Sequence, residues 1–187
     1  MSKLAKTFTL SVWAKLFVMT TVACAVVAFD QFSKAYMRHY LASGPQPLLP
    51  GVIRLVLVQN KGAAFSIGEG SSWLFVIFAL VIVVAAYIWV VCDKQLPASI
   101  VIGLGIVCGG GVGNLIDRVV AGAVTDFLAT EFIDFPIFNV ADIAITCGII
   151  GTFLLVHHFD AARLDANASS VEDSTSNQKD SPDQGQA

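Results

Sequence analysis

Long apolar runs alternate with short polar stretches along this chain, and the pattern predicts four membrane-spanning helices. The runs cover roughly residues 12–32, 73–92, 96–116 and 139–157. Each has about 20 residues, which as an α-helix matches the ~30 Å thickness of the hydrocarbon core of a bilayer. We therefore expect an all-α membrane protein with a single bundle of four helices.

The polar residues that border these runs are the next feature. They are Asp30, Asn114, Asp117, Asp126, Asn139 and Asp142. In a bundle with alternating directions, the end of the first span, the end of the third and the start of the fourth lie on the same side of the membrane. Carboxylates and amides beside lipid must be paired, hydrogen-bonded or functional. The pattern indicates an active site on that side.

Two longer connections lie on the same side as these polar residues. In residues 45–66, a β-branched run follows Pro50 and Gly51 and precedes a turn at 60–62, which predicts a small sheet or hairpin. Residues 119–138 mix phenylalanines with acidic residues, which is typical of a short element lying in the membrane interface. Such an element could cover a site.

Composition agrees with a membrane protein and sets the domain boundaries. Hydrophobic residues make up 56% of the chain, charged residues only 13%, and the mean hydropathy is +0.73, which excludes an ordinary soluble enzyme. We expect a cytoplasmic N-terminus at 1–11, a membrane domain at 12–158 with extracytoplasmic connections at about 41–72 and 117–138, and a disordered polar cytoplasmic tail at 159–187.

Charge and special residues refine this interpretation. Lys3, Lys6 and Lys15 favour a cytoplasmic N-terminus, and the three spans that follow favour a retained first helix over a cleaved signal peptide. The many glycines of the third span favour close helix packing. His157 and His158 lie at the opposite end of the fourth span from the carboxylates, so we expect no metal site.

Five short motifs occur in a fixed order. They are DQFSK at 30–34, NKGAAF at 60–65, GGVGNLIDR at 110–118, VTDF at 124–127 and FNVAD at 138–142. Together they closely resemble the bacterial lipoprotein signal peptidase family, also called signal peptidase II, over about residues 12–158.

The resemblance implies a membrane aspartic endopeptidase that removes the signal peptide from diacylated prolipoproteins by cleaving before the lipid-modified cysteine. It implies Asp126 and Asp142 as the catalytic pair. It further implies four transmembrane helices, a small extracytoplasmic β-cradle and a short periplasmic helix, in the bacterial inner membrane with the active site toward the periplasm. Its implied partners are prolipoprotein substrates, membrane lipid and globomycin-type inhibitors. We expect a monomer with no cofactor and no nucleic-acid partner.

The chemistry can also be argued from the residues. Peptide hydrolysis by two carboxylates needs one ionised group and one protonated group, which close like charges and a dry environment provide. Asp117 is the rival to Asp126, but the adjacent Arg118 predicts an ion pair that keeps Asp117 charged. Asp142 follows Asn139 by three residues at the positive end of a helix, which favours ionisation.

The remaining polar residues have open roles. Asp30 and Lys34 are spaced as a helix-surface ion pair, or else they orient the substrate. Asn60, Asn114, Arg118 and Asn139 bind substrate carbonyls or fix the aspartates. An alternative function is a proton- or ion-coupled transporter. That class keeps carboxylates near the bilayer middle and two related halves, whereas the middles of these spans contain no ionisable residue.

Overall fold

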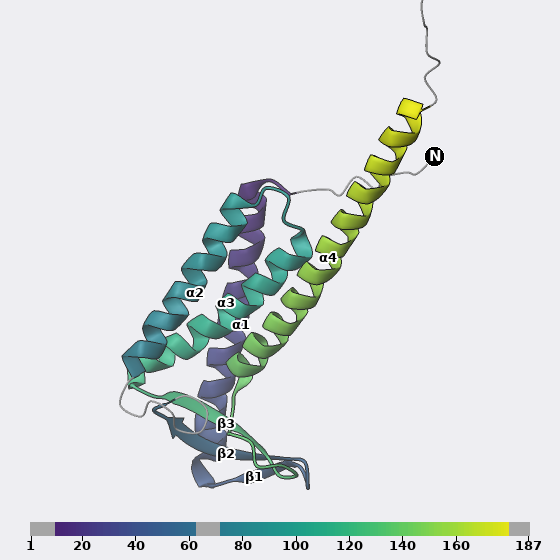
Figure 1. Cartoon of the computed structure of the whole chain (residues 1–187). Coiled ribbons are helices and arrows are strands. Elements are labelled where there is room, and N and C mark those ends of the chain that lie inside the picture. Colours follow the sequence, from purple (N-terminus) through teal and green to yellow (C-terminus); the bar gives the residue numbers. More distant parts are fainter. Residues whose placement is uncertain (1–9, 63–71, 180–187) are drawn as a thin grey trace, which may run out of the picture. The chain divides into compact units, whose positions relative to one another are not determined.

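The computed structural model describes residues 10–62 and 72–179, with backbone only at 72 and 162–179. Its four long helices are α1 (Val12–Tyr40), α2 (Ser72–Cys92), α3 (Ala98–Ala121) and α4 (Val140–Lys179) (Figure 1). All four are long and apolar enough to cross a membrane, with mean hydropathies of 1.9 to 3.1 over their best windows. The prediction of four spans is confirmed, and the chain is a multi-pass membrane protein.

The chain forms two compact units, Met1–Thr152 and Phe153–Ala187. The sheet, the cavity and all candidate site residues belong to the first. In the second, α4 continues to Lys179, whereas the sequence predicts disorder from residue 159. The stretch 159–179 contains neither proline nor glycine, and it extends a helix that has already formed, so it needs no new nucleation. Residues 180–187 lie outside the described part of the chain.

Glycines set the distances between the helices of the first unit. A Cβ atom added at Gly105 would lie 2.9 Å from the carbonyl oxygen of Met19 on α1, and one at Gly109 would lie 2.6 Å from Cβ of Val26. A Cβ at Gly110 would come equally close to the backbone of α4, at 2.6 Å. These contacts confirm the predicted close packing, which brings polar residues on α1, α3 and α4 within hydrogen-bonding distance.

A three-stranded antiparallel sheet lies beside the helix ends that carry these residues (Figure 1). Its strands are β1 (Gln46–Leu49), β2 (Ile53–Asn60) and β3 (Val124–Thr130), in the order β1-β2-β3. The expected hairpin within 45–66 is confirmed by the pairing of β1 with β2. Pairing of Val58 with Asp126 fixes the register of β2 on β3.

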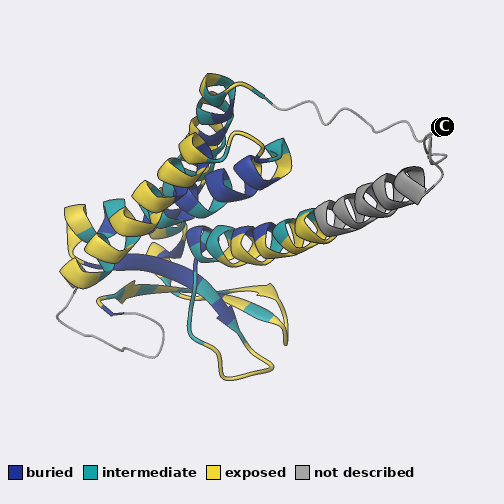
Figure 2. Ribbon diagram, turned by 45° about the horizontal axis from the view of Figure 1, so that its top comes forward, coloured by how far each residue is buried: buried dark blue, intermediate teal, exposed yellow. Residues whose placement is uncertain are grey.

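The connection between α3 and α4 differs from the prediction. We expected residues 119–138 to hold a separate interfacial element, but residues 124–130 form β3, which is mostly buried (Figure 2). The free edge of β2 supplies hydrogen bonds for its backbone, which a strand lying alone would lack. Among the described residues outside the four long helices, the only helical element is the 3-10 helix η1 (Leu41–Ser43). Motif residues 63–65 lie outside the described residues.

Two chain reversals carry β3 and α4 to the site. Helix α3 ends at Ala121, and Gly122 follows with a left-handed φ of 71°, a conformation that favours glycine. The chain then returns as β3. Just before α4, Phe138 pairs with Leu128 through two backbone hydrogen bonds of 2.8 and 3.0 Å. This bridge holds the first turn of α4 next to β3.

Candidate active site

Asp142 lies in the first turn of α4 and is held by a reciprocal cap. Its backbone N–H donates to Oδ1 of Asn139 at 3.1 Å, while its own Oδ2 accepts from the backbone N–H of Asn139 at 3.0 Å. This is the capping-box arrangement of residues three apart. Oδ1 of Asp142 accepts from Nδ2 of Asn114 at 2.8 Å. Both carboxylate oxygens therefore receive hydrogen bonds.

Asp126 lies on β3 and is almost completely buried, with 2% of its surface exposed. Its Oδ2 accepts from Nδ2 of Asn60 at 2.9 Å, and its Oδ1 accepts from Nδ2 of Asn139 at 2.6 Å. Burial raises the pKa of the Asp126 carboxyl to about 6, and the charge of Asp142 acts in the same direction against the hydrogen bonds from the two asparagines. Asn139 thus contacts both carboxylates and brings them together.

Lys34 is the charged centre of a second layer of buried polar residues. Its ammonium lies 2.8 Å from Asp30 and 3.2 Å from Asp117, and it donates to Oδ1 of Asn114 at 2.9 Å. These partners account for all three of its N–H groups. Asp30 and Lys34 form an ion pair, which was one of their two expected roles, but both side chains are buried and do not lie on the helix surface. Through Asn114 this layer is connected to Asp142.

The predicted partner of Asp117 is wrong. Asp117 pairs with Lys34 on α1, and it accepts further hydrogen bonds from the backbone N–H of Thr125 and from the amide of Gln31, both at 3.0 Å. Neighbouring residues on a helix point in different directions, so Asp117 and Arg118 do not face each other. Asp117 joins α1 to the start of β3, and it contacts neither Asp126 nor Asp142 through any hydrogen bond in the described residues.

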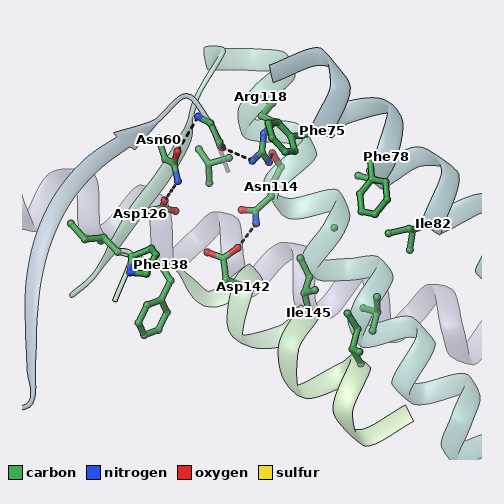
Figure 3. A pocket seen from close by; sticks show the side chains of 18 of the residues that line it. Asn60, Phe75, Phe78, Ile82, Asn114, Arg118, Asp126, Phe138, Asp142 and Ile145 are labelled. Carbon is green, nitrogen blue, oxygen red and sulfur yellow. Dashed lines mark hydrogen bonds between the residues drawn. The ribbon is translucent and has the colours of Figure 1, made fainter. Parts of the chain in front are cut away.

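Arg118 instead borders the cavity (Figure 3). It donates through Nη1 to the carbonyl oxygen of Asn114 and through Nη2 to that of Gly62, both at 3.3 Å. Its guanidinium also lies over the ring of Phe75, 5.1 Å from the centroid. Within the described part of the chain its buried Nε–H has no hydrogen-bond partner.

The cavity itself has a volume of about 580 Å³. Its polar residues are Asn60, Asn114, Arg118, Asp126 and Asp142. Its remaining walls are mainly apolar side chains of α2, of the segment 135–138 and of α4, among them Phe78, Ile82 and Ile145 (Figure 3). A pair of carboxylates therefore opens onto a space suited to an extended apolar ligand.

Comparison with known proteins decides the family. Residues 22–159 match the sequence model of the family described as signal peptidase (SPase) II. This chain belongs to the signal peptidase II family. The match spans every residue of the polar site, from Asp30 to Asp142. Because signal peptidase II is a family of proteases, the transporter alternative loses its support.

Individual signal peptidase II relatives agree. The chain is 36% identical to two lipoprotein signal peptidases of Streptococcus pyogenes, from serotype M5 (strain Manfredo) and serotype M18 (strain MGAS8232), over 73% of this chain and 89% of theirs. Two solved structures of bacterial membrane enzymes, determined by the in meso method, superpose with TM-scores of 0.68 and 0.67 at 30% identity. The superpositions cover 75% and 74% of this chain and 87% and 91% of theirs.

Sequence reasoning did not single out two residues of this signal peptidase II site. The amide of Gln31 donates to Asp30 at 3.2 Å as well as to Asp117, so it links two buried carboxylates. Its place directly after Asp30 in the first motif was the available signal. Thr125 is buried, and its hydroxyl oxygen accepts from Nη1 of Arg38 at 2.9 Å. That contact depends on where β3 meets α1, which no local pattern reveals.

Proposed function

We propose that this protein is an aspartic endopeptidase that removes the signal peptide from diacylated prolipoproteins by cleaving before the lipid-modified cysteine. One observation carries the proposal. Asp126 and Asp142 accept hydrogen bonds from the same residue, Asn139, and both border a cavity with largely apolar walls. Membership in the signal peptidase II family supports the substrate class, since the relatives from Streptococcus pyogenes are lipoprotein signal peptidases.

The two aspartates have environments that suit different protonation states. Asp142 accepts hydrogen bonds at both oxygens, from Asn114 and from the backbone N–H of Asn139, and we assign it the role of the base. Asp126 is buried, and this raises the pKa of its carboxyl to about 6, so it holds a proton at a higher pH than an exposed aspartate does. An apolar substrate that fills the cavity removes more water and moves this pKa further upward. The catalytic form is therefore a pair that carries one proton.

Hydrolysis by this pair balances without any additional reactant. Asp142 takes a proton from a water molecule, whose oxygen attacks the scissile carbonyl carbon while Asp126 donates its proton to the carbonyl oxygen. When the C–N bond breaks, the proton on Asp142 passes to the leaving amine, and Asp126 recovers its own proton from the collapsing intermediate. The products are a new carboxyl group on the signal peptide and a free amine on the lipid-bearing cysteine.

The supporting residues hold this arrangement and receive the substrate. Lys34 and Asp30 orient Asn114, whose Nδ2 then faces Asp142. Asn60 and Asn139 hold Asp126 in position through the hydrogen bonds that their side-chain amides donate to its carboxylate. The buried Nε–H of Arg118, at the edge of the cavity, is a donor for a substrate carbonyl.

We place the protein in the inner membrane as a monomer, with the site toward the periplasm in contact with lipid and open to globomycin-type inhibitors. Cysteine-accessibility labelling tests the orientation, after replacement of the four native cysteines. An impermeant reagent applied to intact cells should label Glu131→Cys but not Gln95→Cys. Labelling of Gln95→Cys but not of Glu131→Cys would show that the protein has the opposite topology.

Removal of the protein from cells gives the decisive test of function. Uncleaved, diacylated prolipoprotein should accumulate, and normal processing would refute the proposal. With purified protein, single-turnover cleavage of a diacylated substrate should be abolished in Asp126→Asn and Asp142→Asn. Asp134→Asn is the matched control, because Asp134 is an exposed acid outside the cavity. A folded, fully active Asp126→Asn would remove that residue from the catalytic role.

A further inference from the structure

Gly111 is the glycine of α3 that helix packing does not explain. Helix α3 has six glycines, and an added Cβ atom at five of them would meet a neighbouring helix at 2.9 Å or less. At Gly113, for example, it would lie 2.5 Å from Oδ2 of Asp30. At Gly111 it would meet no heavy atom of the described residues within 4 Å. A glycine weakens a helix relative to alanine, so packing alone gives no reason for one here.

The place of Gly111 in the cavity provides a reason. It lines the cavity together with Val107, Asn114 and Arg118, and successive members of this set are three or four residues apart on the same face of α3. The hydrogen bond between Asn114 and Asp142 places these two residues at the same level of α3 and α4. One turn further into the membrane, α4 presents Ile145 to the cavity, while α3 presents only the backbone of Gly111.

We propose that Gly111 sets the size of the apolar group that the substrate can insert next to the catalytic pair. The inference rests on the proposed function and adds a specificity-determining residue to it. The absent side chain leaves room against the backbone of α3, one helical turn from the hydrogen bond between Asn114 and Asp142. The group that enters this room is apolar, because the surrounding walls include Ile145 and Phe78. It belongs either to a side chain of the signal peptide or to an acyl chain of the lipid.

Substitutions of increasing size test the proposal. The kcat/KM for a full diacylated lipopeptide should fall about tenfold in Gly111→Ala and at least about a hundredfold in Gly111→Leu, since misfit of one methylene in an apolar pocket costs 10–200-fold. Trimmed substrates should restore cleavage by Gly111→Leu. One series carries smaller side chains before the cysteine and the other carries shorter acyl chains, and the series that restores cleavage identifies the group.

Matched variants separate this role from a structural one. At Gly151 on α4 an added Cβ also meets nothing, and that residue does not line the cavity, so Gly151→Leu should retain wild-type cleavage. Gly110→Leu should lower the Tm in detergent, because its Cβ would collide with the backbone of α4. Gly111→Leu should keep the wild-type Tm. A loss of cleavage by Gly111→Leu that no trimmed substrate reverses would overturn the inference, as would a Tm as low as that of Gly110→Leu.

Binding distinguishes failure of this inference from failure of the proposed function. A fluorescent diacylated lipopeptide that spans the cleavage site should bind wild type and Gly151→Leu but bind Gly111→Leu at least about a hundredfold more weakly. This difference does not require cleavage. If wild type binds the probe without cutting it, the proposed function fails, while the inference that Gly111 limits the size of the bound group remains. Equal binding by Gly111→Leu and wild type refutes only the inference that Gly111 limits the size of the bound group.

Discussion

Burial of Asp126 makes the stability of this protein depend on pH in a direction that can be worked out. The pKa of Asp126 is about 6 in the folded protein and about 3.8 for the unperturbed group. Between these values the folded state binds more protons than the unfolded state. The free energy of unfolding therefore falls as the pH rises from about 4 to about 6, and this contribution is constant above that range. Asp126→Asn cannot ionise and removes the dependence.

The size of the effect follows from the shift. A difference of about two pKa units corresponds to about 3 kcal/mol at 1.36 kcal/mol per unit. Asp126 is 2% exposed, so solvent screening reduces this little. In Asp126→Asn one of the two hydrogen bonds, from Asn60 or from Asn139, is lost because the amide has only one acceptor oxygen, at a cost of about 1–3 kcal/mol that does not vary with pH. The stability of Asp126→Asn relative to wild type should therefore increase by about 2.5 kcal/mol between pH 4 and pH 7, because at pH 4 the unfolded carboxyl is already about half ionised.

Thermal unfolding in detergent measures this difference. For a chain of this length, 1 kcal/mol moves the Tm by about 2–4 °C, so the Tm of Asp126→Asn minus that of wild type should increase by about 5–10 °C from pH 4 to pH 7. Comparison of the two proteins at each pH cancels the titration of groups that do not interact with Asp126. Asp134→Asn, which changes an exposed acid, should follow wild type. Parallel Tm curves for wild type and Asp126→Asn would refute the argument that Asp126 is protonated at mildly acidic pH.

Three further predictions concern the site and the tail. If the aspartates act as a unit, the double variant Asp126→Asn with Asp142→Asn should cleave hardly more slowly than either single variant, and an additive loss in single-turnover rate would contradict the shared-proton mechanism. Lys34→Met should lower the free energy of unfolding by about 3–5 kcal/mol, because Asp30 and Asp117 lose their common cation, and addition of Asp30→Asn should recover part of this in the same denaturation assay. Deletion of residues 166–187 should leave the cleavage rate of purified enzyme largely unchanged, and a large loss at equal folded amount would assign the segment a role.

Several features of this protein could be predicted from the sequence because their causes are local. The free energy of transferring an apolar run into lipid is a sum over the residues of that run, so the four spans are recognisable without knowledge of their neighbours. The hairpin within 45–66 followed from β-branched residues and turn residues in the same way. The order of the motifs identified the family. Side chains at the ends of three spans also had to share one membrane side in any bundle of alternating helices.

The partners of individual side chains were decided only by the tertiary structure. Asp117 pairs with Lys34 and not with Arg118, because glycines on α3 bring α1 close enough for its lysine to reach. The segment after α3 became a buried strand because the free edge of β2 was available to it. Asn139 joins the two aspartates because Phe138 pairs with β3. Such contacts depend on helix distance and strand register between segments far apart in the chain, and no local pattern in the sequence contains that information.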